Sequence, residues 1–178
     1  MTHGIVLDPT ATARKEGHSA GPPLGQLGGK VIGMRRDFWL SWDVVTDEWA
    51  RMLTEAGASV KFWHHQPPVG KQAEAVLASY NSFLTETDAT IAGLCNCGAC
   101  TMWTIHDALL SLERDHPTIV CTTEHFRELA ISLAGQGGRQ EIRMQVLPYP
   151  LQGRADDDVR QVARDTFPSL LEAFGAVV

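Results

Sequence analysis

Three cysteines stand within six positions of the sequence, in the stretch "GLCNCGACTMWTIHD" (93–107): Cys95, Cys97 and Cys100. The chain contains one other cysteine, Cys121. A cluster of this kind can hold a metal ion, make and break a disulfide, or supply a nucleophile. Cys97 and Cys100 form a C-x-x-C pair, and this spacing permits a small disulfide ring in which one thiolate attacks and the other resolves the adduct.

The cysteine loop comes directly before a predicted helix. If that helix begins near Thr101, which can act as its N-cap, Cys97 and Cys100 lie just before its N-terminus. The unpaired backbone N–H groups and the helix dipole favour an anion there, so the pKa of a thiol falls below its free value of ~8.5. Gly98 is expected to supply the backbone freedom that the loop needs.

A zinc site is the alternative interpretation of the same residues, with Cys95, Cys97, Cys100 and a histidine as ligands. Structural zinc usually draws its ligands from two separate knuckles, and the chain has no second cysteine pair. We therefore predict no cofactor. If a metal is bound after all, we expect the three clustered cysteines to be its ligands. Cys121 lies inside an apolar strand and is expected to be an inert core residue.

Alternating strands and helices must position this loop. The hydrophobic pattern predicts strands at 30–34, 59–63, 89–94, 117–123 and 141–149, and helices at 42–58, 71–87, 101–116, 126–134 and 155–175, the last one bent or split by Pro168. Such alternation predicts an α/β fold: a single flavodoxin-like or Rossmann-like three-layer domain over 30–178, with five parallel strands in the order 2-1-3-4-5. Residues 1–29 carry prolines and glycines without sustained periodicity and are expected to be an extended N-terminal arm.

Ligands of such sheets bind beyond the carboxyl ends of the strands, where the strand order reverses. Here that point lies between the first and third strands, which deliver Arg35 and Arg36 on one side and the cysteine loop on the other. Consecutive arginines suit a carboxylate or phosphate, so we predict that they bind an anionic substrate group. The alternative is one outward arginine and one arginine paired with Asp37.

The same edge supplies further candidates. Glu124 and His106 are predicted to move protons, and Thr101 and Thr122 are predicted to contact the substrate. His106 shares a helical face with apolar residues, so a hydrogen-bonded core histidine is its alternative role. The chain has no G-x-G-x-x-G motif and no P-loop, and a nucleotide cofactor is not expected.

Net charge and the length of the apolar runs limit which partners and which cellular location can be expected. The net charge of −6 argues against general affinity for nucleic acid or an anionic membrane. No apolar run approaches the ~20 residues that cross a bilayer, and the start of the chain lacks a secretory pattern. We therefore expect a cytoplasmic protein, in which clustered cysteines serve catalysis, redox exchange or metal binding more often than a disulfide framework.

Several stretches together resemble one protein family. "NCGACTMWTIHDA" (96–108) is similar to the signature of the UGSC-like proteins, in which selenocysteine or cysteine, glycine, serine and cysteine precede a threonine and a W-x-x-H-D-A helix. The likeness extends over "LDPT" (7–10), "LGQLGGKVIG" (24–33), "PTIVCTTEHF" (117–126) and "LPYPLQG" (147–153). Ala99 departs from the family's serine. More locally, the loop is similar to that of the selenocysteine-containing subunits of glycine and proline reductases.

The resemblance implies roles for two of the cysteines. Cys97 stands where relatives carry selenocysteine, which is kept where a nucleophile must be ionised and easily oxidised. Cys97 would then be the attacking atom and Cys100 the resolving one. The family has no general reaction that would name the substrate.

The resulting hypothesis is a thiol-dependent enzyme that acts on a small-molecule substrate and is regenerated by an external thiol or a thioredoxin-like reductant. One alternative is reductive cleavage of an activated carbon–heteroatom bond. The other is a metal-binding or non-catalytic subunit of a larger complex. Assembly as a homo-oligomer or within a heteromeric complex is compatible with either.

Overall fold

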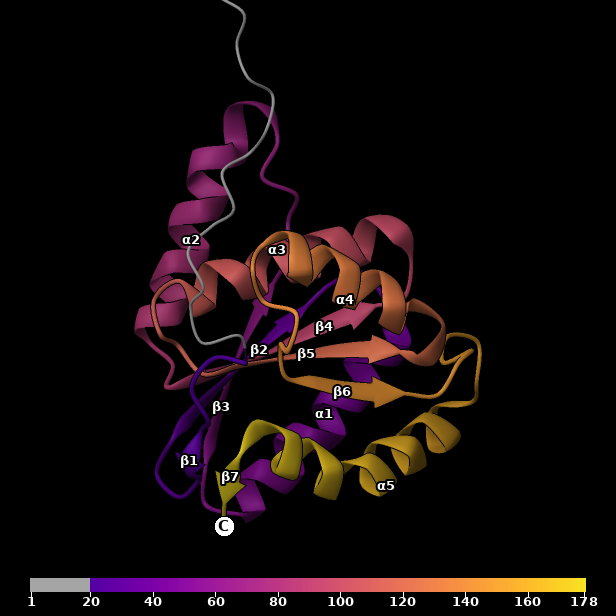
Figure 1. Ribbon diagram of the computed structural model, residues 1–178. Coiled ribbons are helices and arrows are strands. Elements are labelled where there is room, and N and C mark those ends of the chain that lie inside the picture. The colour runs from indigo at the N-terminus through magenta and orange to yellow at the C-terminus, as the bar shows by residue number, and fades with distance from the viewer. Residues whose placement is uncertain (1–19) are drawn as a thin grey trace, which may run out of the picture.

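Five parallel strands form the central sheet of the computed structural model, which describes residues 20–178 (Figure 1). The strands are β2 (Val31–Arg36), β3 (Ser59–His64), β4 (Ala89–Cys95), β5 (Thr118–Thr123) and β6 (Met144–Leu147). They lie in the order β3-β2-β4-β5-β6. Counted along the chain this is the predicted order 2-1-3-4-5, which is confirmed. The order reverses between β2 and β4, so this is where a ligand crevice is expected.

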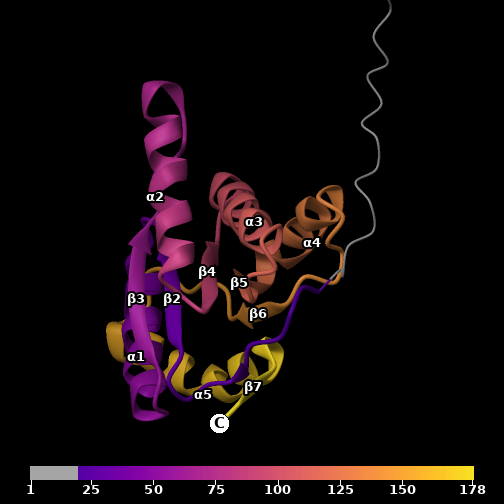
Figure 2. The same ribbon diagram turned by 90° about the vertical axis from the view of Figure 1, so that its left-hand side faces the viewer.

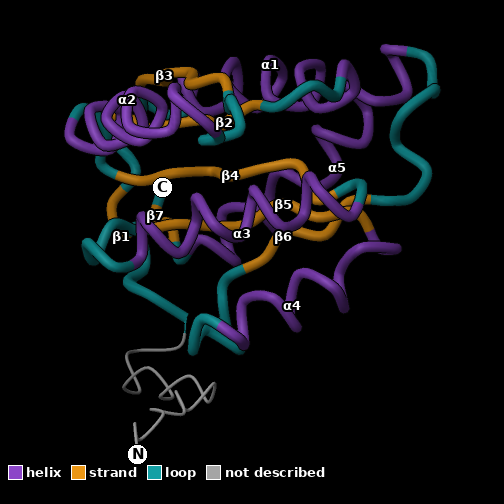
Figure 3. The backbone as a smooth tube through the Cα atoms, turned by 90° about the horizontal axis from the view of Figure 1, so that it is seen from above, coloured by secondary structure: helices purple, strands orange, loops and turns teal. Residues whose placement is uncertain are grey.

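Helices cover both faces of the sheet. One face carries α1 (Leu40–Glu55) and α5 (Asp156–Phe174), and the other carries α2 (Ala73–Thr85), α3 (Gly98–Leu112) and α4 (Arg127–Gln136) (Figures 1 and 2). Short 3₁₀ turns, η1 (Gly70–Gln72) and η2 (Glu124–Phe126), precede α2 and α4. Seen from above, α2 lies over β3 and β2, while α3 follows β4 and β5 (Figure 3). Within residues 20–178 no helix combines the length and apolarity that a membrane crossing requires.

Tryptophans anchor the face that α1 and α5 cover. Trp42 and Trp49 are fully buried and meet edge to face, with their ring centroids 5.7 Å apart. The indole N–H of Trp49 donates to the carbonyl of Ala163 at 2.8 Å and so ties α1 to α5. β4 and β5 are buried along their whole length, as expected for parallel strands with helices on both faces.

Some predicted boundaries differ from the observed ones. α3 begins at Gly98, before the predicted start at Thr101, and this change affects the site. The fifth strand is only four residues long, because the segment before it forms turns. α5 continues through Pro168 to Phe174, so a split of this helix is not observed.

The predicted N-terminal arm lies largely outside the described residues. Its described part, 20–29, packs against the domain: Leu24 and Leu27 are buried in the core. Next to them β1 (Gly25–Gln26) pairs in parallel with β7 (Ala176–Val177), which brings the two ends of the described chain together. The sequence pattern did not predict this small second sheet.

Candidate functional site: a cysteine pair at a helix N-terminus

Cys97 is the N-cap of α3. Its backbone is extended, with φ −155° and ψ 171°, and its sulfur atom accepts a hydrogen bond from the backbone N–H of Cys100 at 3.0 Å. Cys97 therefore occupies the position predicted for Thr101, and the prediction of Thr101 as N-cap is wrong. The correction strengthens the electrostatic argument, because the sulfur itself now receives one of the unpaired N–H groups of the helix.

Cys97 and Cys100 are joined as a disulfide, with their Cα atoms 5.2 Å apart. This separation is within the range that disulfides require. Both residues are partly exposed, whereas Cys95 and Cys121 are buried. The pair accessible to an external reagent is thus the C-x-x-C pair.

Thr101 fixes the backbone of the cysteine loop from inside the first turn. Its side chain is buried, and its hydroxyl donates to the carbonyl of Cys97 at 2.6 Å. Gly98, by contrast, is exposed, and a Cβ there would meet open space; its φ lies outside the left-handed region. The expectation that the loop needs a glycine at this position is wrong, since Gly98 is simply the first residue of the helix.

Cys95 is chemically distinct from its two neighbours. Burial raises the pKa of its thiol to about 12, although the charge of Arg35 and hydrogen bonds with Thr104 and Thr101 oppose the rise. Burial also raises the pKa of Cys121, as an inert core thiol requires. Among residues 20–178 no three His, Cys, Asp or Glu side chains are grouped as metal ligands. The donor set of the metal alternative is therefore not gathered in this arrangement.

Arg35 connects the strand before the cysteine loop to the helix after it. Its guanidinium is fully buried and donates to the carbonyl of Gly93 at 2.7 Å, on β4. It also donates to the carboxylate of Asp107 at 2.8 Å and to the hydroxyl of Thr104 at 3.2 Å, both on α3. One side chain thus holds both flanks of the segment that contains Cys97.

Asp107, on the buried side of α3, is the carboxylate at the centre of a polar cluster that also contains Arg35, His65 and His106. Its Oδ2 lies 2.8 Å from Nε of Arg35 and 2.8 Å from Nδ1 of His65, and its Oδ1 lies 3.3 Å from Nδ1 of His106. Burial favours the neutral acid, but hydrogen bonds from His106 and His65 and the charge of Arg35 hold the pKa of Asp107 below its usual value. Asp107 is thus a buried carboxylate and not a solvated residue of the helix surface.

Asp37 supports the loop from the end of β2. Its carboxylate accepts the backbone N–H of Leu94 at 2.9 Å and that of Trp39 at 3.2 Å, and it lies 3.8 Å from Arg35. Burial raises the pKa of Asp37, against the hydrogen bond from Leu94 and the charge of Arg35. The carboxylate therefore joins the β2–α1 loop to the end of β4.

Arg36 faces the opposite side of the sheet, as alternation along a strand requires. Its guanidinium donates to Thr46 at 2.7 Å, contacts the carboxylate of Asp47 at 2.5 Å and lies over the ring of Phe62 at 3.8 Å. Arg35 and Arg36 are thus the last two residues of β2, the first strand of the sheet, and each guanidinium is engaged within the protein.

The end of β5 contacts the cysteine loop from the other side. Thr122 and Thr123 are fully buried, and their hydroxyls lie 3.5 Å and 3.3 Å from the carbonyl of Cys95. The hydroxyl of Thr123 also lies 3.1 Å from the side-chain carbonyl of Asn96. Glu124 follows directly in η2 and is exposed.

The predicted site residues fall into two groups. Cys97, Cys100 and Thr101 lie at the start of α3, Thr122 contacts the carbonyl of Cys95, and Glu124 follows β5 in η2. His106 lies farther along α3, and Arg35, on β2, contacts that part of the helix through Asp107. At 1.5 Å per residue, the backbone of His106 is ~13 Å along the helix axis from Cys97. An imidazole at that distance does not hydrogen-bond the sulfur of Cys97.

Two residues of the polar cluster around Asp107 were not predicted as site residues from the sequence: His65 and Asp107 itself. His65 is buried and its ring packs against Trp63 and Trp103, with centroids 5.9 Å and 5.7 Å away. The available signal was helical spacing. Trp103 and Asp107 are four residues apart and share a helix face, so a tryptophan that packs against the domain implied a carboxylate on the same inner face.

Fold and site together define a three-layer α/β protein with a cysteine pair at the N-terminus of the helix that follows a central strand. The sequence model of the UGSC family matches residues 5–176, so the chain belongs to the UGSC family. No curated protein matches the chain.

Solved structures show only distant likeness. RecJ in complex with Mn²⁺ from Thermus thermophilus matches with a TM-score of 0.44 and 17% identity, over 84% of this chain and 19% of that chain. A mutant flavo di-iron protein from Thermotoga maritima matches with a TM-score of 0.41 and 10% identity, over 85% of this chain and 37% of that chain. This chain therefore spans well under half the length of either protein.

Proposed function

We propose that this protein is a thiol-dependent redox enzyme in which Cys97 is the nucleophile and Cys100 the resolving thiol. The observation that carries the proposal is the position of Cys97: it is the N-cap of α3, receives the N–H of Cys100 and is bonded to Cys100 itself. A helix N-terminus stabilises the thiolate of the first cysteine more than that of the second, which lies inside the first turn.

The reaction cycle follows from this asymmetry. In the reduced protein the Cys97 thiolate attacks one sulfur of a small disulfide substrate and expels the other as a thiolate. Cys100 then attacks the sulfur of Cys97, gives its proton to the departing thiolate and leaves the Cys97–Cys100 disulfide. The substrate disulfide gains two electrons and is released as one thiolate, which takes a proton from water, and one thiol, which takes its proton from Cys100. An external thiol or a thioredoxin-like dithiol returns the pair to its reduced form.

The position of each remaining site residue indicates its proposed role. Arg35 positions the loop through Gly93 and Asp107, and Thr101 positions the carbonyl of Cys97. Glu124 is the group proposed to exchange protons near the pair, because it is exposed and directly follows the threonines that contact the loop. Contact of Arg35, Arg36, Thr101 or Thr122 with the substrate remains a prediction, and it requires a partial release of the contacts that these side chains make.

Trapping the mixed disulfide tests the proposal. The reduced Cys100→Ser protein is treated with 5,5′-dithiobis(2-nitrobenzoate), and intact and peptide masses are recorded. We expect a stable adduct on Cys97, whereas the wild-type protein loses the adduct and ends with the Cys97–Cys100 disulfide. Cys121→Ser serves as the matched control and should behave as the wild type.

Two outcomes would reject this function. One is an adduct that persists on wild-type Cys97 although Cys100 is free. The other is a stoichiometric metal in the purified protein, shown by elemental analysis and lost in Cys97→Ser, which would favour the metal-binding alternative. If the protein reacts with disulfides but does not catalyse repeated turnover, the reduced Cys97 and Cys100 pair is to be tested as the reductant of activated carbon–heteroatom bonds.

A further inference from the structure

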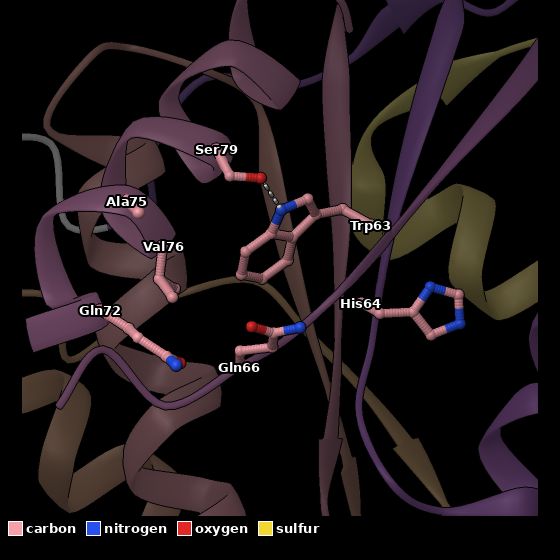
Figure 4. A pocket seen from close by; sticks show the side chains of 7 residues that line it. All are labelled: Trp63, His64, Gln66, Gln72, Ala75, Val76 and Ser79. Carbon is pink, nitrogen blue, oxygen red and sulfur yellow. Dashed lines mark hydrogen bonds between the residues drawn. The ribbon is translucent and has the colours of Figure 1, made fainter.

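A concave site lies between the end of β3 and the start of α2, and no residue of the cysteine loop lines it (Figure 4). Its volume of about 350 Å³ is at the lower end of the range for small-molecule sites. β2 lies between β3 and β4, and neighbouring strands are ~4.8 Å apart, so the site is roughly two strand spacings from the strand that carries the cysteine loop. Its lining residues are Trp63, His64, Gln66, Gln72, Ala75, Val76 and Ser79.

Trp63 provides a fixed aromatic surface for this pocket. Its indole N–H donates to the hydroxyl of Ser79 at 3.0 Å, which holds the ring beside α2 (Figure 4). Tyr80 and Phe83 pack around the indole, with ring centroids 4.7 Å and 6.2 Å away. The indole of Trp63 is already ordered before binding. The Trp63 side chain therefore loses little additional conformational entropy when a flat ring stacks on it.

Two carboxamides border the same space. Gln66 and Gln72 extend toward the space beside the indole, whereas the ring of His64 points away from it (Figure 4). Both glutamines are exposed, and neither has a hydrogen-bond partner within residues 20–178. Each carboxamide offers a donor next to an acceptor, so it can pair with a ligand edge that carries the complementary pair of groups.

The absence of charged side chains in the lining limits the class of ligand that the pocket can bind. No Asp, Glu, Lys or Arg is among the seven lining residues, and Ala75 and Val76 form an apolar wall. A charged ligand would lose its hydration here without gaining a counter-ion. An uncharged flat ring matches both the apolar wall and the aromatic surface.

We infer that this pocket binds an uncharged planar heteroaromatic ring that carries a hydrogen-bond donor beside an acceptor, as on the edge of a nucleobase or a nicotinamide. The ring stacks on Trp63, and Gln66 and Gln72 hydrogen-bond its polar edge. The inference is independent of the thiol chemistry, since no lining residue belongs to the cysteine loop.

Binding of defined probes tests the inference. Adenosine, cytidine and nicotinamide are titrated into the wild-type protein by ligand-observed NMR, with benzyl alcohol as a ring that lacks the paired edge. We expect at least one of the three to bind, and more tightly than benzyl alcohol. Loss of one neutral hydrogen bond in Gln72→Leu should weaken binding by about fivefold to tenfold. Trp63→Leu should weaken it by about tenfold or more, because stacking is lost.

Controls separate binding from folding. Gln161→Leu changes an exposed glutamine of α5, on the opposite face of the sheet, and should leave affinity unchanged. If Trp63→Leu does not fold, the Gln66→Leu and Gln72→Leu proteins decide the question alone. Absence of binding for all three probes, or binding that neither glutamine variant weakens, would overturn the inference without touching the assignment of Cys97.

Discussion

The backbone N–H of Cys100 donates a hydrogen bond to the sulfur atom of Cys97 at 3.0 Å. In the reduced protein this contact favours the Cys97 thiolate, so the pKa of Cys97 should lie below the ~8.5 of a free cysteine. We therefore expect limiting iodoacetamide at neutral pH to label Cys97 before Cys100. Peptide mass mapping after brief exposure measures the order.

The buried thiols provide the internal control for that experiment. Cys95 and Cys121 should react only after unfolding, since burial raises the pKa of both. Early labelling of Cys95 would contradict the separation between a reactive pair and inert thiols. Equal labelling rates for Cys97 and Cys100 would contradict the role of the N-cap.

Asp107 should be the most costly carboxylate to remove. Asp107→Asn leaves the buried guanidinium of Arg35 without its closest counter-ion, and breaking a buried pair in this way costs about 3–5 kcal/mol. Urea unfolding should show this loss in the free energy of unfolding. Asp165→Asn, on the exposed surface of α5, should change it by less than about 0.5 kcal/mol.

The same carboxylate predicts a dependence of stability on pH. The folded protein holds the pKa of Asp107 below its usual value, so the unfolded chain binds a proton at a higher pH than the folded chain does. The contribution of Asp107 is complete above the unfolded pKa of about 3.9 and is lost as the pH falls toward the folded pKa. The difference in unfolding free energy between wild type and Asp107→Asn should therefore shrink below about pH 4. A constant difference down to pH 2 would contradict the depressed pKa.

The sequence was sufficient for the sheet order and for the position of the cysteine loop, because both depend on hydrophobic periodicity and on short connections. It was not sufficient for the partners of the charged residues. Arg35 and Asp107 are 72 positions apart, and their pairing depends on how α3 packs on the sheet, which no local pattern specifies. The start of α3 was misplaced for a different reason: a cysteine is not a usual N-cap residue, whereas Thr101 is a common one.

The two arginines should differ in their effect on Cys97. Arg35→Met leaves Asp107 and Asp37 as uncompensated buried carboxylates near the loop, so the pKa of the Cys97 thiol should rise and stability should fall. Arg36→Met removes contacts with α1 on the other face and should leave that pKa unchanged. The rate of alkylation as a function of pH measures both, with Arg114→Met in the exposed turn after α3 as the control. An unchanged profile in folded Arg35→Met would show that this arginine is not an electrostatic partner of Cys97.

Two glycines of the cysteine segment should respond in opposite ways to alanine. A Cβ at Gly93 would collide with the indole of Trp42, which is fully buried and donates to the carbonyl of Arg35 at 3.1 Å. Overpacking of this kind costs about 1–3 kcal/mol, so Gly93→Ala should lower the free energy of unfolding by that amount. It should also alter the alkylation rate of Cys97, because Gly93 accepts the hydrogen bond from Arg35 that holds the end of β4.

Gly98→Ala is the matched variant on the other side of Cys97. The new methyl group would meet open space at the first position of α3, where alanine has the higher helix propensity. The free energy of unfolding should stay the same or increase by up to about 1 kcal/mol, with normal labelling of Cys97. Urea unfolding of both proteins compares the two glycines directly. A loss of stability in Gly98→Ala would mean that the loop does need the backbone freedom of glycine, and that the start of α3 at Gly98 is not maintained in solution.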